Sequence, residues 1–403
     1  MTVLIGHPTG NPNSHQAALA HLEAGWLEAF CVPWMPSAAG LAVMRAWPGL
    51  RPIADRLSRR RFPALEMAPR VQGRAAEWCR LVSRAIGRGD ESISYQANDW
   101  IMRTMRQESR RPAVSVVHAY EECAELPFEE AKRFDRVCVY DLPIAYYRAW
   151  EEIRPDLAAR YADWLPSTGL PAAPAQRLER KRREIELADL VLAPSAFVAA
   201  TVYEYHPDKD VARTPYGVDT SFWHPPLQRQ DSSKLHFLYV GHASVRKGTP
   251  LLLEAWRRSA LPNAELGLIG SWQLADSKRR SLPKGVWYQP PCSAVELRRR
   301  YAAADVLVFP SYFEGSALVV LEAMACGLPV IVSHAAADPQ LLSPHNSRVI
   351  DPGDLDALVE NLRWFHANQG QLVTMRQAAR AAAEVCTWQA YRSALKKAIA
   401  PFV

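Results

Sequence analysis

The sequence predicts an α/β protein made of two doubly wound domains that face each other across a cleft. Short β-branched runs alternate with longer amphipathic stretches, which is the pattern of parallel sheets with crossover helices. This alternation stops at a polar linker and then starts again, and 403 residues are enough for two domains. A hydrophobic content of 49% supplies the side chains for folded cores and excludes a disordered chain.

The first domain is expected over residues 1–225. Four short apolar runs predict strands, at residues 3–6, 113–118, 136–140 and 190–193. Amphipathic stretches between them predict helices, at residues 14–24, 74–86 and 177–187. The stretch 164–174 is rich in Pro, Ser and Gly and predicts a surface loop.

The second domain is expected over residues 226–385, because the polar, proline-containing stretch 216–231 cannot continue a sheet and predicts a linker. Its five predicted strands lie at residues 236–240, 265–269, 285–288, 306–309 and 330–333. Residues 386–403 form a separate segment, a helix whose apolar stripe is expected to pack back on the first domain, through Trp388, Tyr391, Leu395 and Ile399.

Composition and charge exclude several classes of protein. Seven scattered cysteines form no CxxC or Cys/His cluster, which predicts reduced thiols rather than disulfides or a zinc site. The net charge of +6 suits an anionic ligand, and no nucleic-acid-reading motif accompanies it. No apolar run approaches the ~20 residues of a membrane span, and the N-terminus lacks a basic, signal-like region. We therefore expect a cytoplasmic protein.

The most informative segment is residues 309–329, FPSYFEGSALVVLEAMACGLP. It predicts a strand end, a turn, and a helix that opens near Ser316 and is stopped by Gly327 and Pro329. Gly315 and its neighbours would leave bare backbone amides at the helix N-terminus. Such amides predict a binding site for a diphosphate.

Two glutamates, Glu314 and Glu322, flank this predicted helix start. Eight residues of helix separate them by roughly 12 Å along the axis, which suits two contacts with one nucleotide sugar. Carboxylates are good partners for pairs of hydroxyls, because each oxygen accepts two hydrogen bonds. The alternative is that Glu314 caps the helix and Glu322 is a solvated or paired surface residue. The apolar surroundings of Glu322 favour the functional interpretation, because burying an unpaired carboxylate is costly.

These residues resemble the retaining glycosyltransferases of family 4, which have the GT-B architecture. The resemblance rests on the E-x7-E element within EGSALVVLEAMACGLPVIVS, and it covers most of residues 185–365. Supporting segments are FLYVGHASVRKGTPLLLEAW, ELRRRYAAADVLVFPS, LADLVLAPSAFV and TPYGVDTSFWHP. Before residue 185 the likeness is weaker, although residues 7–25 look like the family's first strand–loop–helix.

The resemblance implies how a donor nucleotide sugar would be held by the second domain. Lys247 matches the lysine that binds the donor diphosphate. The usual arginine after the strand is replaced by His242, so Arg246 is the expected second cation. Glu314 would contact the transferred sugar and Glu322 the ribose. The remaining implied contacts are the backbone of Gly315, Ser316, Ala317 and Leu318 for the diphosphate, and Gln289 and Pro290 for the base.

The first domain supplies the other implied residues. The loop that would approach both donor and acceptor contains Gly10, Asn11 and Asn13, and only one of the family's paired glycines is kept there. His118, predicted at a strand end, resembles a catalytic histidine near the anomeric carbon. Its alternative role is as a core or capping residue. Asp141 is a weaker candidate for the cleft.

Together these features predict a metal-independent, retaining hexosyltransferase. It would move a sugar from a donor such as UDP- or GDP-hexose, a substrate rather than a cofactor, to a hydroxyl of a glycan or lipid-linked acceptor. We expect a role in cell-envelope polysaccharide synthesis. Two alternatives stay open. One is another GT-B enzyme, a phosphorylase or epimerase, for which neither a cofactor lysine nor other cleft carboxylates are visible. The other is a non-catalytic nucleotide-sugar-binding or scaffold protein.

One further segment predicts a partner. Residues 41–62 are rich in arginine and interleaved with apolar side chains, which suits an anionic bilayer on the inner face of the membrane. The alternative is an arginine-rich, solvated helix whose apolar side packs on the sheet. The similar charge run at residues 177–183 is expected to be solvated only.

Overall fold

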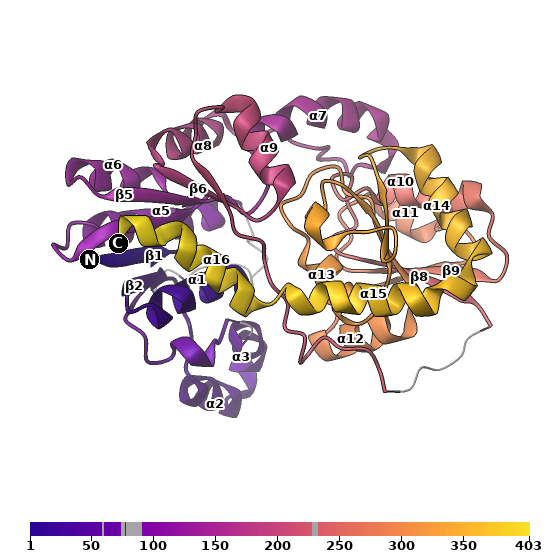
Figure 1. The fold of residues 1–403 in the computed structure, drawn as a ribbon, viewed down its shortest axis with the longest axis horizontal. Helices are drawn as coiled ribbons and strands as arrows, with labels where there is room; N and C mark the ends of the chain where they lie inside the picture. Colours follow the sequence, from indigo (N-terminus) through magenta and orange to yellow (C-terminus); the bar gives the residue numbers. More distant parts are fainter. Residues whose placement is uncertain (59, 74–76, 78–90, 228–232) are drawn as a thin grey trace.

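The computed structural model describes residues 1–58, 60–73, 77, 91–227 and 233–403. Two parallel sheets stand side by side, each covered by helices, as Figure 1 shows. The helix expected over residues 74–86 lies outside the described residues, apart from residue 77.

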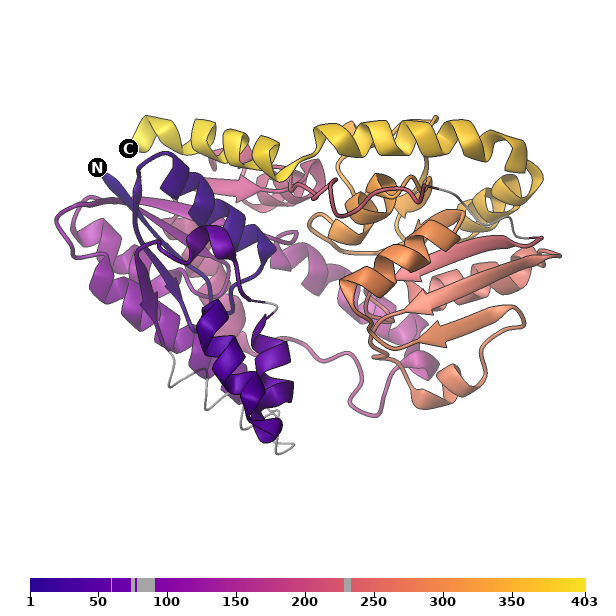
Figure 2. The same ribbon diagram turned by 90° about the horizontal axis from the view of Figure 1, so that it is seen from below.

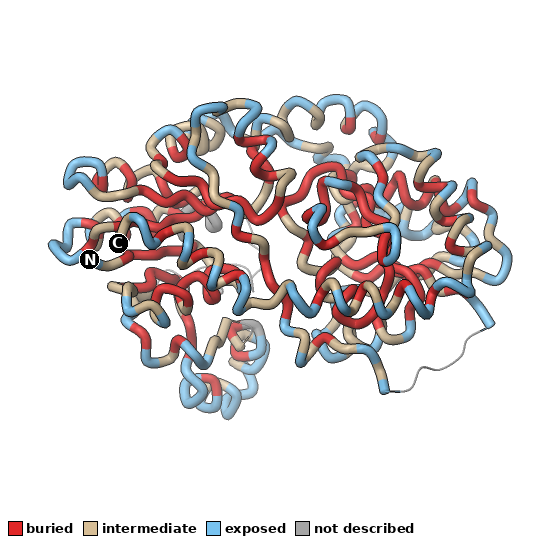
Figure 3. The backbone as a smooth tube through the Cα atoms, viewed as in Figure 1, coloured by how far each residue is buried: buried red, intermediate tan, exposed pale blue. Residues whose placement is uncertain are grey.

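The N-terminal sheet has seven strands in the order β3-β2-β1-β4-β5-β6-β7. Their bounds are β1 (Thr2–Gly6), β2 (Leu27–Val32), β3 (Arg70–Gln72), β4 (Val114–Tyr120), β5 (Val137–Asp141), β6 (Leu190–Ala193) and β7 (Val211–Arg213). The helices of this half are α1 (Pro12–Glu23), α2 (Ala38–Ala46), α3 (Arg51–Ser58), α5 (Glu91–Glu108), α6 (Glu125–Arg133), α7 (Tyr147–Arg160), α8 (Ala175–Leu187) and α9 (Ala196–Tyr205). The central strands are wholly buried, as the continuous apolar runs of parallel strands require (Figure 3).

The C-terminal sheet has six strands in the order β10-β9-β8-β11-β12-β13. They are β8 (Leu235–Val240), β9 (Ala264–Ile269), β10 (Val286–Gln289), β11 (Val306–Phe309), β12 (Val330–Ser333) and β13 (Ser347–Ile350). The helices are α10 (Thr249–Ser259), α11 (Asp276–Arg280), α12 (Ala294–Ala303), α13 (Leu318–Ala325), α14 (Leu355–Ala367) and α15 (Leu372–Val385). The prediction of two doubly wound, Rossmann-like domains is confirmed.

The C-terminal helix α16 (Trp388–Ile399) crosses back to the first domain, as predicted, and brings the two chain termini close together (Figure 2). It packs on α1, where Arg392 donates to Gln16 over 2.6 Å and pairs with Glu23 at 2.9 Å. At the crossing, Val218 pairs with Thr387 in a short parallel bridge. The last strand of the first sheet ends at Arg213 and the first strand of the second begins at Leu235, on either side of the predicted boundary.

Four of the strands that the structure describes are missing from the sequence-based prediction: β2, β3, β7 and β13. β3 and β7 are three-residue edge strands, too short for a periodic pattern. β4 runs on to Tyr120, so His118 lies inside the strand and not at its end, which corrects the prediction. Because Ala119 and Tyr120 follow it within the strand, His118 is set back from the carboxyl end of the sheet, where ligands bind in such folds.

The chain between β5 and α8 leaves the first domain and lies against the second. Figures 1 and 2 both place α7 beside the C-terminal domain. The hydroxyls of Tyr161 and Tyr312 share a hydrogen bond of 2.7 Å, and the amide of Ala275 donates to the carbonyl of Trp164 over 2.9 Å. The first residue of the predicted surface loop, Trp164, therefore contacts the second domain.

Candidate active site

The loop between β11 and α13 carries the predicted glutamate pair. The sequence predicts a helix start near Ser316, but α13 begins at Leu318. The amide of Ala317 donates to the carbonyl of Ala336 over 2.9 Å, so this predicted phosphate-binding amide already has a partner. Because α13 begins after Glu314, the predicted separation of 12 Å along a helix does not apply to the two glutamates.

Lys247, Arg246 and Glu314 converge at this loop. The ammonium of Lys247 pairs with Oε1 of Glu314, and the guanidinium of Arg246 lies 3.5 Å from the same oxygen. Arg246 also donates to the carbonyl of Phe313 over 2.7 Å. Glu314 is only 7% exposed, so its charge is shielded from water and depends on these two cations. The predicted cation pair and the first glutamate therefore form one cluster.

The conformation of one glycine brings Lys247 to this cluster. Gly248 has φ +74°, in the left-handed region, and a Cβ there would overlap the carbonyl oxygen of Pro310. The turn can therefore lie directly against the chain that leads to Glu314. Burial lowers the pKa of Lys247 and the charge of Arg246 lowers it further, while Glu314 opposes both. A second anion near Lys247 would stabilise its charged form.

A cavity of about 340 Å³ opens next to Lys247. It lies where β8, β9 and β11 end, which is where parallel α/β sheets bind ligands. The helix α13 presents its first turn to the cavity through Leu318 and Val319. Most of the other lining residues come from strand ends and the loops after them: Gly241, His242, Gly270, Ser271, Pro291, Cys292 and Phe309.

Glu322 lies on α13, one turn beyond these residues. The hydroxyl of Tyr301 donates to its Oε2 over 3.3 Å. Burial raises the pKa of Glu322 to about 7, and the Tyr301 hydrogen bond opposes the shift. Such a carboxyl changes its charge near neutral pH. A polar ligand bound beside it would therefore shift its protonation.

The predicted base-binding residues, Gln289 and Pro290, lie just before the residues that line this cavity. Gln289 ends β10, and its carbonyl accepts a 3.0 Å hydrogen bond from the amide of Gly270. The cavity wall is formed by Pro291 and Cys292 instead. His242, which replaces the family's arginine, also lines the cavity. Burial and the nearby cations lower the pKa of His242, so Arg246 is the better second cation.

The predicted residues of the first domain have mainly structural partners. Asn11 caps α1 by accepting a 2.8 Å hydrogen bond from the amide of Ser14. Gly10 has φ +68° and its amide donates to His7 over 2.9 Å. Asn13 is buried, and its Oδ1 has no partner among the described residues.

His118 does not reach the cluster around Glu314. It is fully buried, with Nδ1 3.0 Å from Nε2 of His21 and Nε2 3.4 Å from Oδ2 of Asp141. Its ring stacks on Tyr120 at 5.5 Å. The structure therefore supports the alternative interpretation, a core histidine, for His118, and Asp141 is its partner rather than a residue of the cleft.

The first domain instead reaches Glu314 through the chain that follows β5, a contact that sequence reasoning missed. The amide of Ala145 donates to the carbonyl of Glu314 over 3.1 Å. The hydroxyl of Ser195 donates to the carbonyl of Gly315 over 2.5 Å. A Cβ at Gly315 would overlap the carbonyl oxygen of Pro143. The glutamate loop is therefore held between the two domains.

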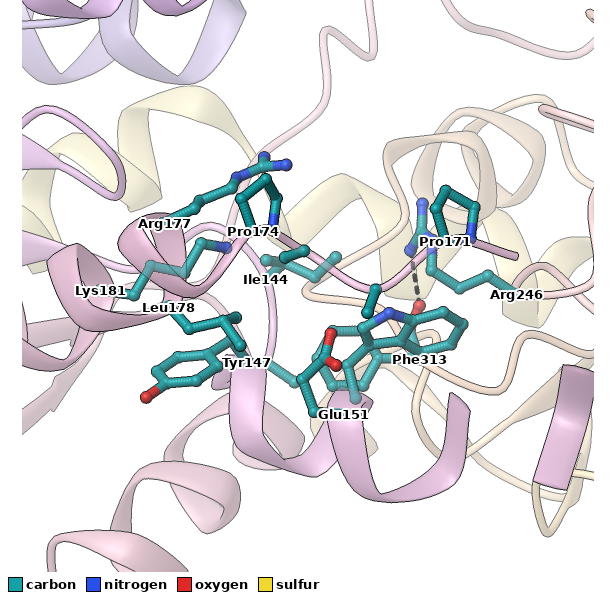
Figure 4. Close-up of a pocket in the computed structure, with 14 residues that line it drawn as sticks. Ile144, Tyr147, Glu151, Pro171, Pro174, Arg177, Leu178, Lys181, Arg246 and Phe313 are labelled. Atoms are coloured by element: carbon teal, nitrogen blue, oxygen red, sulfur yellow. Dashed lines mark hydrogen bonds between the residues drawn. The ribbon is translucent and has the colours of Figure 1, made fainter. Parts of the chain in front are cut away.

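A second cavity, of about 290 Å³, lies between the domains on the other side of Arg246 (Figure 4). Tyr147 and Trp150 of α7, Arg177 and Lys181 of α8, and Phe313 of the glutamate loop line it. Among the residues that the structure describes, no group of three or more His, Cys, Asp or Glu side chains is arranged to hold a metal ion.

Comparison with known proteins finds a family match in the C-terminal half. Residues 224–382 match the family model described as glycosyl transferases group 1. A D-inositol 3-phosphate glycosyltransferase of Pseudarthrobacter chlorophenolicus is 30% identical over 195 residues, 43% of this chain and 46% of the relative. An O-antigen chain mannosyltransferase B of Escherichia coli is 33% identical over 147 residues, 33% of this chain and 38% of the relative. The chain thus spans less than half the length of these relatives.

Solved structures match over the whole chain. Sucrose-phosphate synthase from Thermosynechococcus elongatus superposes with a TM-score of 0.69 at 16% identity, covering 100% of this chain and 98% of that one. Anabaena HepE in complex with UDP-glucose superposes with a TM-score of 0.61 at 14% identity, covering 100% of both chains. The chain therefore has the GT-B fold, and its C-terminal domain carries the sequence features of the group 1 glycosyltransferases.

Proposed function

We propose that this protein is a retaining glycosyltransferase of family 4 that transfers a hexose from a nucleotide sugar to an acceptor hydroxyl. The observation that carries the proposal is the convergence of Lys247, Arg246 and Glu314 beside a cavity at the strand ends of the C-terminal sheet. This cluster supplies two cations for a diphosphate and one carboxylate for sugar hydroxyls. The match of residues 224–382 to glycosyl transferases group 1 supports the same assignment.

In this proposal the donor occupies the cavity of about 340 Å³. Lys247 and the first amides of α13 hold the diphosphate from the cavity wall, Arg246 adds a second positive charge from the other side of Glu314, and Glu314 binds hydroxyls of the sugar. Glu322 binds the ribose hydroxyls, one turn further along the helix. The main chain at Pro291 and Cys292 contacts the base.

The reaction breaks the bond between the anomeric carbon and the diphosphate oxygen, and the electron pair leaves with that oxygen. The acceptor hydroxyl forms the new bond on the same face of the sugar, and its proton passes to the departing phosphate. The developing negative charge is met by Lys247, Arg246 and the N-terminus of α13, where charge stabilisation counts most. Because these groups supply positive charge themselves, we expect turnover to persist in EDTA.

The first experiment screens UDP-, GDP- and ADP-sugars for nucleotide release, and the free nucleotides for a rise in Tm. Binding at 100 times Kd raises the free energy of unfolding by about 2.7 kcal/mol. Glu314→Gln is expected to lower turnover about 100-fold while nucleotide binding persists, because Glu314 touches the sugar and not the nucleotide. Nucleotide binding without turnover for any donor would favour the scaffold alternative. Full turnover by Glu314→Gln would remove Glu314 from the mechanism.

We further propose that the hairpin of α2 and α3 contacts an anionic bilayer. It projects from the first domain (Figure 2) and has a small core of its own around Leu41 and Leu57. Val43 and Trp47 are 65% and 67% exposed, with arginines beside them. Among the described residues, no helix is long and apolar enough to cross a membrane, so a surface contact is the proposed mode.

Sedimentation with vesicles of phosphatidylglycerol and phosphatidylcholine tests this contact. Trp47→Ala should lower the bound fraction on anionic vesicles several-fold, whereas Tyr203→Ala, an exposed aromatic change on α9, should not. Equal binding of both variants and the native protein would argue that the hairpin is merely solvated.

A further inference from the structure

Helix α7 borders two cavities with two different faces. Tyr147 and Glu151 line the interdomain cavity beside Arg246 (Figure 4). A further cavity, of about 410 Å³, lies against the other face of α7, which carries Ala149, Glu152, Ile153, Asp156 and Leu157. Residues three and four positions apart share one side of a helix, so these five form one continuous face. The further cavity, the α7–α9 groove, is therefore distinct from the one beside Arg246.

The buried part of the α7–α9 groove is aromatic. Helix α9, which lies next to α7 in Figure 1, contributes Phe197, Thr201 and Tyr205. The glutamate loop contributes Tyr312 and Phe313, which are 6% and 4% exposed. The rings of Phe197 and Phe313 lie 6.4 Å apart at 82°. A concave site of this size and lining is typical of small-molecule binding, and ring faces attract organic cations.

The charged side chains that line the groove are all carboxylates. Glu152 and Asp156 come from α7 and Glu204 from α9, and all three residues are exposed at the rim. None of them forms an ion pair with another residue that the structure describes, whereas their neighbour Glu151, on the other face of α7, pairs with Arg154 at 3.2 Å. The rim therefore carries three formal negative charges on a chain whose net charge is +6.

The hydroxyl of Tyr205 lies within the field of these carboxylates. Burial raises the pKa of Tyr205, and Glu152 and Glu204 raise it further. The guanidinium of Arg148 lies 5.8 Å from the centre of the Tyr205 ring and opposes this shift, but Arg148 does not line the groove. With the charge of Arg148 included, the carboxylates are still in excess by two.

The spacing of the carboxylates selects among cations. Within the part of the chain that the structure describes, no three acidic, His or Cys side chains are close enough to hold one metal ion, so these carboxylates do not converge on a point. Glu152 and Asp156 are separated by roughly 6 Å along α7, and Glu204 stands on the facing helix. A linear polyamine carries its ammonium groups three or four carbons apart. It can therefore meet each carboxylate separately, while its methylene chain covers the rings.

We propose that the α7–α9 groove binds a linear polyamine, an organic cation with two or more ammonium groups. The ammonium groups pair with the three carboxylates, and the methylene chain lies on the rings of Phe197 and Phe313. Because the whole chain is positively charged, a polyamine gains nothing from its overall field, and binding depends on the local charge of the groove. The ligand lies beside Phe313, which directly precedes Glu314, but the proposal does not depend on the proposed transferase function.

The first test is calorimetric titration of the full chain with spermidine, putrescine and butylamine. We expect one spermidine per chain, with a Kd that rises with salt. Each lost ammonium group should weaken binding about three- to fivefold, so butylamine should bind about tenfold or more weakly than spermidine. Mg²⁺ should displace spermidine no better than NaCl of the same ionic strength, because the carboxylates do not converge.

Variants locate the site. Glu152→Gln and Glu204→Gln should each raise the Kd for spermidine about three- to fivefold, and the double variant about tenfold. Phe197→Leu, which keeps an apolar side chain but removes the ring, should raise it about threefold. Glu360→Gln, an exposed carboxylate change on α14 that does not line the groove, is the matched control and should leave the Kd unchanged. Thermal melts without ligand check that each variant is folded.

Three outcomes would overturn the polyamine proposal. The first is no binding of spermidine up to about 1 mM, and the second is native affinity in the double variant. The third is a trilysine peptide that binds about tenfold more tightly than spermidine, which would make the groove a docking site for a basic protein segment. None of these measurements uses a nucleotide sugar. A failure of the proposed function is seen separately, when UDP, GDP and ADP leave the Tm unchanged and no donor releases nucleotide.

Discussion

The two sides of the interdomain site are built in different ways. On the proposed donor side, Lys247, Arg246 and Glu314 lie on two neighbouring loops that follow adjacent strands of one sheet. In the cavity between the domains, Trp150, Lys181 and Phe313 come from two helices of the first domain and a loop of the second. The family model covers residues 224–382, which include the whole donor side.

The difference shows how much of each site a sequence can reveal. A lysine before a left-handed glycine and a carboxylate in an apolar segment are local patterns with local physical reasons. A wall made of α7, α8 and Phe313 exists only because the chain after β5 leaves its own domain and packs on the other one. Each prediction below tests one side of this comparison.

The largest effect is expected on the donor side. Lys247→Met removes a cation that we propose meets the leaving diphosphate, so turnover should fall by about 100- to 1,000-fold. Nucleotide affinity should fall as well, because the ground-state diphosphate loses the same partner. Lys397→Met, an exposed change on α16, is the matched control. A Lys247→Met enzyme with native turnover would show that Arg246 alone supplies the charge. Initial rates and nucleotide Kd values provide the measurement.

A smaller effect is expected where the two sides meet. Gly315→Ala places a Cβ against the carbonyl of Pro143, so the glutamate loop and the first domain must move apart. Turnover should fall about 10- to 30-fold, while free nucleotide binds within about threefold of the native affinity, because the donor cavity belongs to one domain. Gly370→Ala, where a Cβ would meet nothing nearby, is the control. Equal losses of nucleotide binding and turnover would contradict the expectation that one domain binds the nucleotide while turnover requires both domains.

The smallest effect concerns pH. The pKa of Glu322 is raised from 4.5 to about 7 in the folded protein, so the folded state binds more protons than the unfolded state between these values. Glu322 therefore makes the unliganded protein less stable as pH rises from 4.5 to 7, and its effect is constant above that. The nucleotide KM should fall a few-fold from pH 6 to 8, as the ionised carboxylate becomes available to the ribose. In Glu322→Gln, the pH dependence of stability and the pH dependence of the nucleotide KM should both become weaker. Thermal melts and KM values across this range provide the measurement.

Much of the fold was predictable because parallel strands are buried on both faces. β6 and β11 are continuous apolar runs and β8 and β12 each contain one polar residue, and the positions of all four agree with the prediction to within a residue. The edge strands β3 and β7 are too short to produce a pattern. The strand end at His118 was misplaced because Ala119 and Tyr120 extend β4, and this error put a core histidine into the predicted site.

The candidate site was also predictable from the sequence only in part. The sequence indicated Lys247, Arg246 and Glu314, which the structure brings together, whereas of the predicted base contacts Gln289 ends strand β10, one residue later than the predicted strand end. Nothing local in the sequence marks Ala145 or Trp150 as neighbours of the glutamate loop. Gly315 was the one signal in the sequence that the backbone of another segment, at Pro143, lies against the glutamate loop.

By itself, the sequence determined the two-domain architecture and marked the loops of Lys247 and Glu314 as a candidate site, because apolar periodicity, glycine geometry and the cost of burying a charge act over a few neighbouring residues. Tertiary structure alone decided that His118 is enclosed beneath α1 and that α7 forms part of a cavity with the opposite domain. Those outcomes depend on the length of the segment after β5 that packs on the second domain, and on the long-range contacts that hold this segment in place. No local sequence pattern encodes such contacts.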